Sequence, residues 1–310
     1  MNSKMTFYIL KRIFLAIFTV WVVITVTFFV MHAVPGGPFV GEKATTPAVQ
    51  AAMEAKYGLD KPVMEQYFTY LKDIVTKFDF GPSLKQRGRM VIDIIFDGMK
   101  TSMVLGLIAA GISALFGILL GAVAALRRNK LIDRIIMVIT TAFVSMPSFI
   151  MGSLLLALFA IELQILPANG STPAGLILPI VTLALYPMAY ITRLTRSSML
   201  DVLGQDYIRT ARAKGNSNKD AIIHHAIRNS LIPVVTQIGI SFAGTIGGAV
   251  VTENIFAIPG IGSMLINAVK SRDVPVVMGT VIFITIIVGV INLIVDLICA
   301  IVDPRIDLAS

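Results

Sequence analysis

The sequence predicts an all-α integral membrane protein with six transmembrane helices, because it has few charges and several long apolar runs. Only 14% of the 310 residues are charged and 56% are hydrophobic, whereas a soluble domain has about 25% charged residues. Each charge-free run has about 19 residues or more, which at ~1.5 Å per residue is enough to cross ~30 Å of hydrocarbon. The runs occupy residues 13–31, 103–126, 135–161, 174–192, 229–252 and 274–295.

The first run is predicted to be a retained transmembrane helix at 13–32, after a cytoplasmic tail at 1–12. Basic residues before it resemble the positively charged start of a signal peptide. The apolar stretch is longer than the core of a signal peptide, however, and the sequence His-Ala-Val-Pro-Gly-Gly that follows is a poor cleavage site. We therefore expect this helix to remain in the mature protein.

The distribution of lysine and arginine predicts the orientation of the helices. Fifteen of these residues lie in the N-terminal tail, the 127–134 loop, the 193–228 segment and the C-terminal tail at 303–310. The short loops predicted on the opposite side, 162–173 and 253–273, contain two. Because basic loops stay in the cytoplasm, both termini are expected there. The net charge of +8 then reflects topology and contact with anionic lipid, and no nucleic-acid partner is expected.

Residues 33–102 form a long segment predicted on the extracytoplasmic side. The stretch 64–75 has apolar residues at helical spacing, and Pro62 precedes it near the expected helix start. Turn residues mark "VPGGPF" at 34–39 and "FDFGPS" at 78–83. The segment contains neither a metal-ligand cluster nor a nucleophile with a suitably spaced base. We expect a small cap on the helical bundle.

The remaining core, 103–302, is predicted to hold the other five transmembrane helices, with kinks at Pro147, Pro179 and Pro187. Asp296 lies in the last run with Asn292 one turn earlier. A carboxylate in a membrane helix must be paired or face a polar cavity. Because Asp296 is close to the cytoplasmic end, we expect a structural hydrogen bond or ion pair. A role in moving protons or cargo is the alternative.

The polar, basic segment 193–228 stands out from the apolar sequence around it. Residues 206–214 favour a helix, and Gly215 stands where a helix would end in the left-handed conformation. Ser217 precedes Asp220 by three residues, which is a capping-box pattern for a second helix. Three interpretations remain open: a DNA-binding helix–turn–helix, which the flanking membrane helices disfavour; a loop that grips lipid head groups; and a rigid docking element for a cytoplasmic partner.

This segment resembles the cytoplasmic EAA loop in membrane subunits of binding-protein-dependent ABC importers, in the oligopeptide/dipeptide branch. That branch reads like "DYIRTARAKG" followed by "HAIRNSLIPV", which stand here at 206–215 and 225–234. Arg209 replaces the glutamate of the general motif, and Gly37 stands where the family usually has aspartate. Further blocks in the branch's order cover essentially the whole chain: "VPGGP", "GLDKPVMEQY", "FAIPGIG", "RDVPVVMG" and "NLIVDLICAIVDPRI".

The resemblance implies a type I ABC importer permease fold and a set of partners. Such a permease pairs with a second homologous permease and with two cytosolic ATPase subunits. It receives a peptide substrate from an extracytoplasmic substrate-binding protein, and its EAA loop inserts a short helix into a groove on an ATPase. The residues to which the resemblance assigns ATPase coupling are Asp206, Tyr207, Arg209, Thr210, Ala211, Arg212, Ala213, Lys214, Gly215, Ser217 and Asp220.

The chain itself is expected to be non-catalytic, with no catalytic residue, no metal site and no bound cofactor. The phosphate-binding pattern GxxxxGK[ST] does not occur in the sequence. ATP and Mg²⁺ are therefore expected on the partner ATPase subunits. The expected location is the cytoplasmic (inner) membrane of a prokaryote, as a multi-pass protein in contact with membrane lipid.

The segment 256–270 is expected to fold back toward the outer mouth of the pathway. It combines a proline-glycine turn with several apolar side chains. The residues expected at this gate or along the substrate path are Phe256, Ile258, Pro259, Ile261 and Met264. A re-entrant loop that only packs on the bundle is the alternative.

Oligopeptides or dipeptides are the expected cargo. The aliphatic spans, with scattered Ser, Thr and Gly, fit a wide conduit of low specificity. Nickel or another small solute is the alternative cargo within the family. A secondary transporter is the alternative class, although we see neither inverted repeats nor ionisable residues near the midplane. An ion channel is a third possibility, but the "AIPGIGSM" loop lacks the charge of a selectivity filter.

Overall fold

The computed structural model describes residues 3–34, 58, 60–215, 217, 220, 222 and 226–302, and in these ranges the regular elements are helices. One isolated bridge joins Pro82 and Met90. The predicted all-α fold class is confirmed. The helices are α1 (Ser3–Ala33), α3 (Val63–Lys77), α4 (Val91–Leu126), α5 (Leu131–Ser145), α6 (Ser148–Leu155), the π-helix η1 (Leu156–Glu162), the 3-10 helix η2 (Ala174–Leu176), α7 (Ile177–Leu203), α8 (Asp206–Ala213), α10 (Arg228–Ser230), α11 (Ile232–Ile255), α12 (Ile261–Ser271) and α13 (Val274–Val302).

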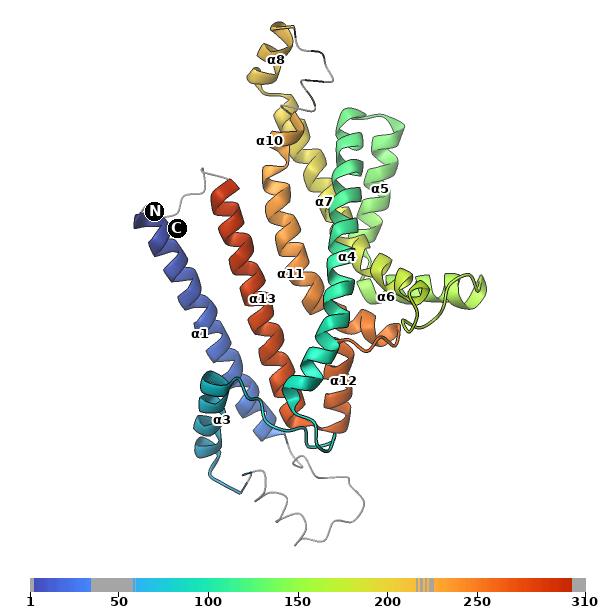
Figure 1. The fold of residues 1–310 in the computed structure, drawn as a ribbon. Helices are drawn as coiled ribbons and strands as arrows, with labels where there is room; N and C mark the ends of the chain where they lie inside the picture. The colour runs from blue at the N-terminus through green and yellow to red at the C-terminus, as the bar shows by residue number, and fades with distance from the viewer. Residues whose placement is uncertain are drawn as a thin grey trace.

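Among the described residues, four helices are long and apolar enough to cross a membrane, namely α1, α4, α7 and α13. The number rises to six if each of two bent pairs, α5 with α6–η1 and the two parts of α11, is one span. In Figure 1, α1 runs beside α13, and α4, α7 and α11 complete the bundle. The start of α1 and the end of α13 lie toward the same end as α8, opposite α3 and α12 (Figure 1).

The third span, predicted at 135–161 with a kink at Pro147, is broken there into two helices. Helix α5 ends at Ser145, Met146 is extended (φ −96°, ψ 124°), and α6–η1 leaves at an angle of 107° to α5. Pro147 explains the break, because it has no N–H to donate and its ring disfavours a helical conformation at the preceding residue. As a result α6 runs sideways from the bundle (Figure 1).

The second span begins earlier than predicted. The charge-free run starts at residue 103, but helix α4 begins at Val91 and continues unbroken for 36 residues. Its first turns bury Val91, Ile94 and Ile95 and expose three charged side chains at helical spacing. An amphipathic start therefore extends the helix into the segment predicted as part of the external cap. The exposed charged residues are Asp93, Asp97 and Lys100.

The external cap is built around α3, which spans the predicted helix at 64–75 with Pro62 directly before it. Phe78 (φ 54°) and Gly81 (φ 84°) are left-handed, which confirms the turn at "FDFGPS". The turn at "VPGGPF" lies outside the described residues after Val34. Polar contacts between side chains help to hold α3 against α1: the Tyr67 hydroxyl lies 2.9 Å from the Thr25 hydroxyl, and Gln66 Oε1 lies 3.1 Å from His32 Nε2.

Helices α4 and α7 pack closely along glycines of α4. A methyl group added at Gly121 would lie 2.6 Å from the carbonyl oxygen of Thr192, and one added at Gly117 would lie 2.7 Å from a methyl carbon of Ile191. Small residues four apart let two membrane helices approach until their backbones touch. Helix α7 itself runs for 27 residues with Pro187 inside it. The contact therefore joins the C-terminal half of α4 to the middle of α7.

Helix α12 is held at its N-terminus by the fully buried Glu253 of α11. The Ser102 hydroxyl of α4 donates to Glu253 Oε1 at 2.5 Å, and the N–H groups of Gly262 and Ser263 donate to Oε2 at 2.8 and 3.2 Å. Ser102 Oγ also accepts from the N–H of Ile261 at 2.9 Å. The carboxyl group thus satisfies the first donors of α12, where the helix dipole favours an acidic group, and joins three helices.

A second buried carboxylate holds the other end of α12. Asp273, between α12 and α13, is 2% exposed. It accepts a hydrogen bond from the Ser83 hydroxyl and another from the Leu84 N–H at 3.1 Å. Because Ser83 and Leu84 belong to the external loop that leads into α4, α12 is fastened to the cap as well as to the bundle.

Replacing Glu253 should destabilise the protein strongly. Glu253→Ala leaves the buried N–H groups of Gly262 and Ser263 without this acceptor, at about 1–3 kcal/mol each, so we expect a loss of about 2 kcal/mol or more. Glu253→Gln keeps the shape and one acceptor and should lie between alanine and wild type. Thermal unfolding of the detergent-purified protein measures this order. Glu162→Ala, which removes an exposed carboxyl, is the matched control, and an unchanged midpoint in Glu253→Ala would contradict the assignment.

Candidate functional site

The candidate coupling site is the end of the bundle that carries α8. Helix α8 projects beyond the ends of the neighbouring helices (Figure 1). It begins three residues after α7 ends at Leu203, and its side chains are largely polar. The Asp206 and Arg209 side chains are 94% and 75% exposed, with a loose ion pair of 3.5 Å between them. A short exposed helix attached to a long membrane helix has the form expected of a docking element.

The end of α8 has the predicted conformation. Gly215 has φ +89°, and a methyl group added there would meet nothing within 4 Å. Glycine is therefore required by the backbone and not by crowding, because other residues rarely adopt this φ value. Ala213, Lys214 and Gly215 are exposed. The side chains of Ala211 and Arg212 lie outside the described set.

The predicted cap after Gly215 is present in part. The Asp220 N–H donates to Ser217 Oγ at 3.1 Å, and the Ser217 hydroxyl donates to the Asp220 carboxylate. These are the contacts of a helix N-terminus. The rest of the predicted second helix and its bend at Asn216 lie outside the described residues.

Ile208 and a hydrogen bond of Tyr207 fix α8 to the bundle. Ile208 is completely buried, and it anchors the inner face of α8. The Asn229 side chain donates to the Tyr207 hydroxyl at 3.2 Å, which joins α10 to α8. One step further, the Ser198 hydroxyl of α7 donates to the carbonyl of Ser230 at 2.9 Å. The two segments that bracket the loop, α7 and α10, are therefore joined to each other as well as to α8.

Three of the predicted gate residues are buried in this conformation. Phe256, Ile258 and Ile261 are at most 1% exposed. Phe256 and Ile258 belong to a core cluster with Leu105 and Leu178, and the Phe256 carbonyl accepts from the Gly170 N–H at 2.9 Å. Side chains packed in this way do not touch cargo in this conformation, and their role at a gate stays a prediction.

The other two predicted gate residues remain accessible. Pro259 is exposed and Met264 is half-buried. A role for them in the substrate path stays a prediction.

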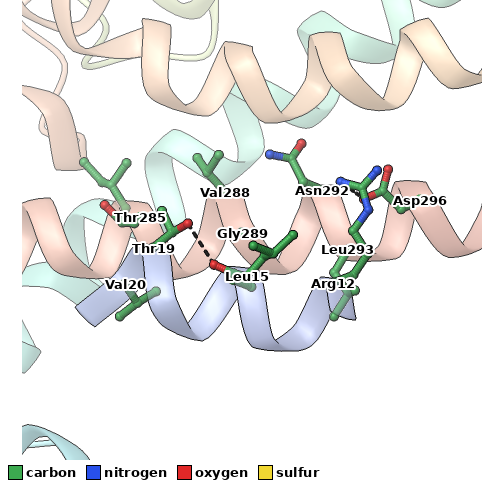
Figure 2. A pocket seen from close by; sticks show the side chains of 12 residues that line it. Arg12, Leu15, Thr19, Val20, Thr285, Val288, Gly289, Asn292, Leu293 and Asp296 are labelled. Carbon is green, nitrogen blue, oxygen red and sulfur yellow. Dashed lines mark hydrogen bonds and ion pairs between the residues drawn. The ribbon is translucent and has the colours of Figure 1, made fainter. Parts of the chain in front are cut away.

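Asn292 and Asp296 both line a cavity of about 390 Å³ between α1 and α13. Figure 2 shows them on α13 facing the Arg12 side chain of α1. Asp296 Oδ2 lies 3.1 Å from Arg12 Nη1, and the two side chains are 27% and 45% exposed. The carboxylate has the ion pair that a membrane helix requires, with a partner from the first helix.

Several residues at these sites were missed by sequence reasoning. In the sequence, Ile208 looks like one more apolar residue of a basic helix, and Ser198 and Ser230 look like ordinary serines in helices. Glu253 stands three residues before the start of the "FAIPGIG" block, and an acidic residue in this apolar run was a detectable signal. Arg196 was counted only as a cytoplasmic charge.

Comparison with known proteins agrees with this geometry. The family model described as binding-protein-dependent transport system inner membrane component matches residues 117–308, and the model of its N-terminal part matches residues 5–105. The dipeptide transport system permease protein DppB of Bacillus subtilis is 45% identical over 97% of this chain and 98% of its own length. The oligopeptide transport system permease protein OppB of Haemophilus influenzae is 40% identical over 96% and 98%.

Two solved structures share the fold at 16% sequence identity. An inward-facing MetNI methionine ABC transporter has a TM-score of 0.56 and covers 68% of this chain and 97% of that one. An amino acid ABC transporter with histidines has a TM-score of 0.53 and covers 69% and 95%. The predicted family and fold are thus confirmed: the chain belongs to the family of binding-protein-dependent transport system inner membrane components.

Proposed function

We propose that this chain is a transmembrane subunit of an ATP-driven importer for oligopeptides or dipeptides. The observation that carries the proposal is its near-full-length similarity to permeases named for those cargoes, 45% and 40% identical. The apolar helices with few fixed charges support a conduit that accepts peptides with different side chains. Selectivity then belongs to the extracytoplasmic binding protein that delivers the peptide.

The chain supplies half of the pathway, and a second homologous permease supplies the other half. ATP and Mg²⁺ are bound by two cytosolic ATPase subunits, so this polypeptide is non-catalytic. The end of the bundle that carries α8 faces the cytoplasm with both termini, and α3 and α12 face outward. The concentration of basic residues near α8 supports this orientation under the positive-inside rule.

Coupling between ATP hydrolysis and transport passes through α8. The exposed face of α8 docks on an ATPase, and the left-handed Gly215 reverses the chain behind it. Ile208 and the Tyr207–Asn229 hydrogen bond join α8 to the bundle. A displacement of the ATPase groove is therefore passed to α7, which continues into the membrane without interruption.

Gly215→Pro should abolish peptide uptake while leaving membrane insertion intact. Proline fixes φ near −65° and cannot adopt the +89° seen here. We expect ATP hydrolysis to be lost or uncoupled from uptake in the reconstituted complex. Gly204→Ala is the matched control, because Gly204 has an ordinary φ of −79° and a methyl group there makes only normal contacts. Wild-type binding to the ATPases and wild-type uptake in Gly215→Pro would refute the docking role of this loop.

Deleting this subunit should make cells resistant to toxic peptide analogues. The deletion should also stop growth on peptides as the sole source of a required amino acid, because intact peptides no longer enter. Growth on the free amino acid is the control, and uptake of labelled dipeptide is the direct measurement. Intact peptide uptake together with lost nickel accumulation would replace the peptide assignment with a metal one.

A further inference from the structure

An ion pair near the cytoplasmic end of the bundle joins α7 to α5. Arg196 Nε lies 2.6 Å from Asp133 Oδ1, and Arg196 Nη2 lies 2.8 Å from Asp133 Oδ2. The side chains are 23% and 4% exposed. Two parallel hydrogen bonds between a guanidinium and a carboxylate fix the relative orientation of the groups as well as their distance.

Asp133 also organises the turn between α4 and α5. The Asn129 N–H donates to Asp133 Oδ2 at 2.8 Å. Asn129 has φ 63°, a left-handed conformation at the reversal of the chain. One buried carboxylate therefore holds both the turn and α7. With the glycine contact between α4 and α7 described above, these contacts join α4, α5 and α7 at one end.

The pair lies on the route from α8 into the membrane. Arg196 precedes the start of α8 by ten residues, about 15 Å along a helix. Two residues after it, Ser198 bonds the carbonyl of Ser230, whose neighbour Asn229 bonds Tyr207 of α8. Every step from α8 to the α4–α5 turn is thus a directed polar contact or a continuous helix.

A buried ion pair is an expensive way to hold two helices together. Replacing such a pair with apolar side chains of similar volume often leaves stability unchanged or higher, whereas removing one partner leaves an unpaired buried charge. What the pair adds is a defined register between α5 and α7. Coupling between distant sites requires elements that move without slipping past each other.

We propose that Arg196 and Asp133 are positioning residues that make α4, α5 and α7 move as one body when α8 is displaced. The inference rests on the proposed function, since it assigns the pair to coupling between an ATPase and the pathway. Without the pair, α7 still follows α8, but the α4–α5 turn does not follow α7. ATP is then hydrolysed with little transport.

The first test measures ATP hydrolysed per peptide taken up, in proteoliposomes with the complete importer. Asp133→Asn and Arg196→Gln should each raise this ratio about tenfold. A typical coupling free energy between two sites corresponds to a factor of about this size. The reversed pair, Asp133→Arg with Arg196→Asp, should recover part of the loss, because opposite charges again face each other. The double-mutant cycle then measures the interaction between the two residues. Arg193→Gln, which removes an exposed charge one turn earlier on α7, should leave the ratio unchanged. A wild-type ratio in both single variants would overturn the proposal.

The second test keeps the pair intact, so it does not depend on how the Asp133 and Arg196 variants fold. The chain has one cysteine, so Cys299→Ser provides a background for spin labels at Lys130→Cys and Asp201→Cys, both exposed positions on either side of the pair. The distance between the labels should be the same in nucleotide-free and ATP-trapped complexes. A distance that changes with nucleotide would overturn the proposal. Failure of the wild-type complex to import peptide would refute the proposed function and leave this measurement valid.

Discussion

Polar groups inside a hydrocarbon layer must find their partners within the protein, and this constraint explains much of the architecture. Three acidic side chains of the long helices illustrate it. Glu253 accepts hydrogen bonds from two other helices. Asp133 forms an ion pair with Arg196, and Asp296 forms one with Arg12. Each carboxylate joins helices that are far apart in the sequence, so it helps to determine which helices are neighbours and in which register. The apolar surface makes the helices insert, and the acidic groups determine how they associate.

Close backbone contact is the second consequence of the same environment. Lipid tails are as apolar as leucine, so association of membrane helices depends on fit more than on hydrophobic burial. Gly117 and Gly121 let α7 lie directly on α4. At the opposite end, a methyl group at Gly260 would overlap the carboxyl group of Glu253. The glycines thus allow the polar contacts to form at hydrogen-bonding distance.

Local features of the structure could be predicted from the sequence, whereas contacts between distant segments could not. The helix at 64–75, the break at Pro147 and the left-handed Gly215 each follow from residues within one or two turns. The start of α4 was missed because Asp93 and Asp97 look like loop residues until their exposed face is known. The bond between Arg196 and Asp133 spans 63 residues of sequence, and nothing near either residue indicates its partner. The burial of the apolar residues at 256–261 could not be predicted either, because apolar residues beside a proline-glycine pair look the same whether they line a pathway or fill a core.

The hydrogen bonds of Glu253 with α4 and α12 also determine when the helices can finish packing together during synthesis. Ser102 and Glu253 are 151 residues apart in sequence, and translation adds about 5–20 residues per second. For roughly ten seconds or longer after α4 is synthesised, Ser102 therefore lacks its hydrogen bond to Glu253. Arg12 is without its partner still longer, because Asp296 follows it by 284 residues. The order of the chain thus makes these two contacts late steps of assembly, formed only after most of the helices have been inserted.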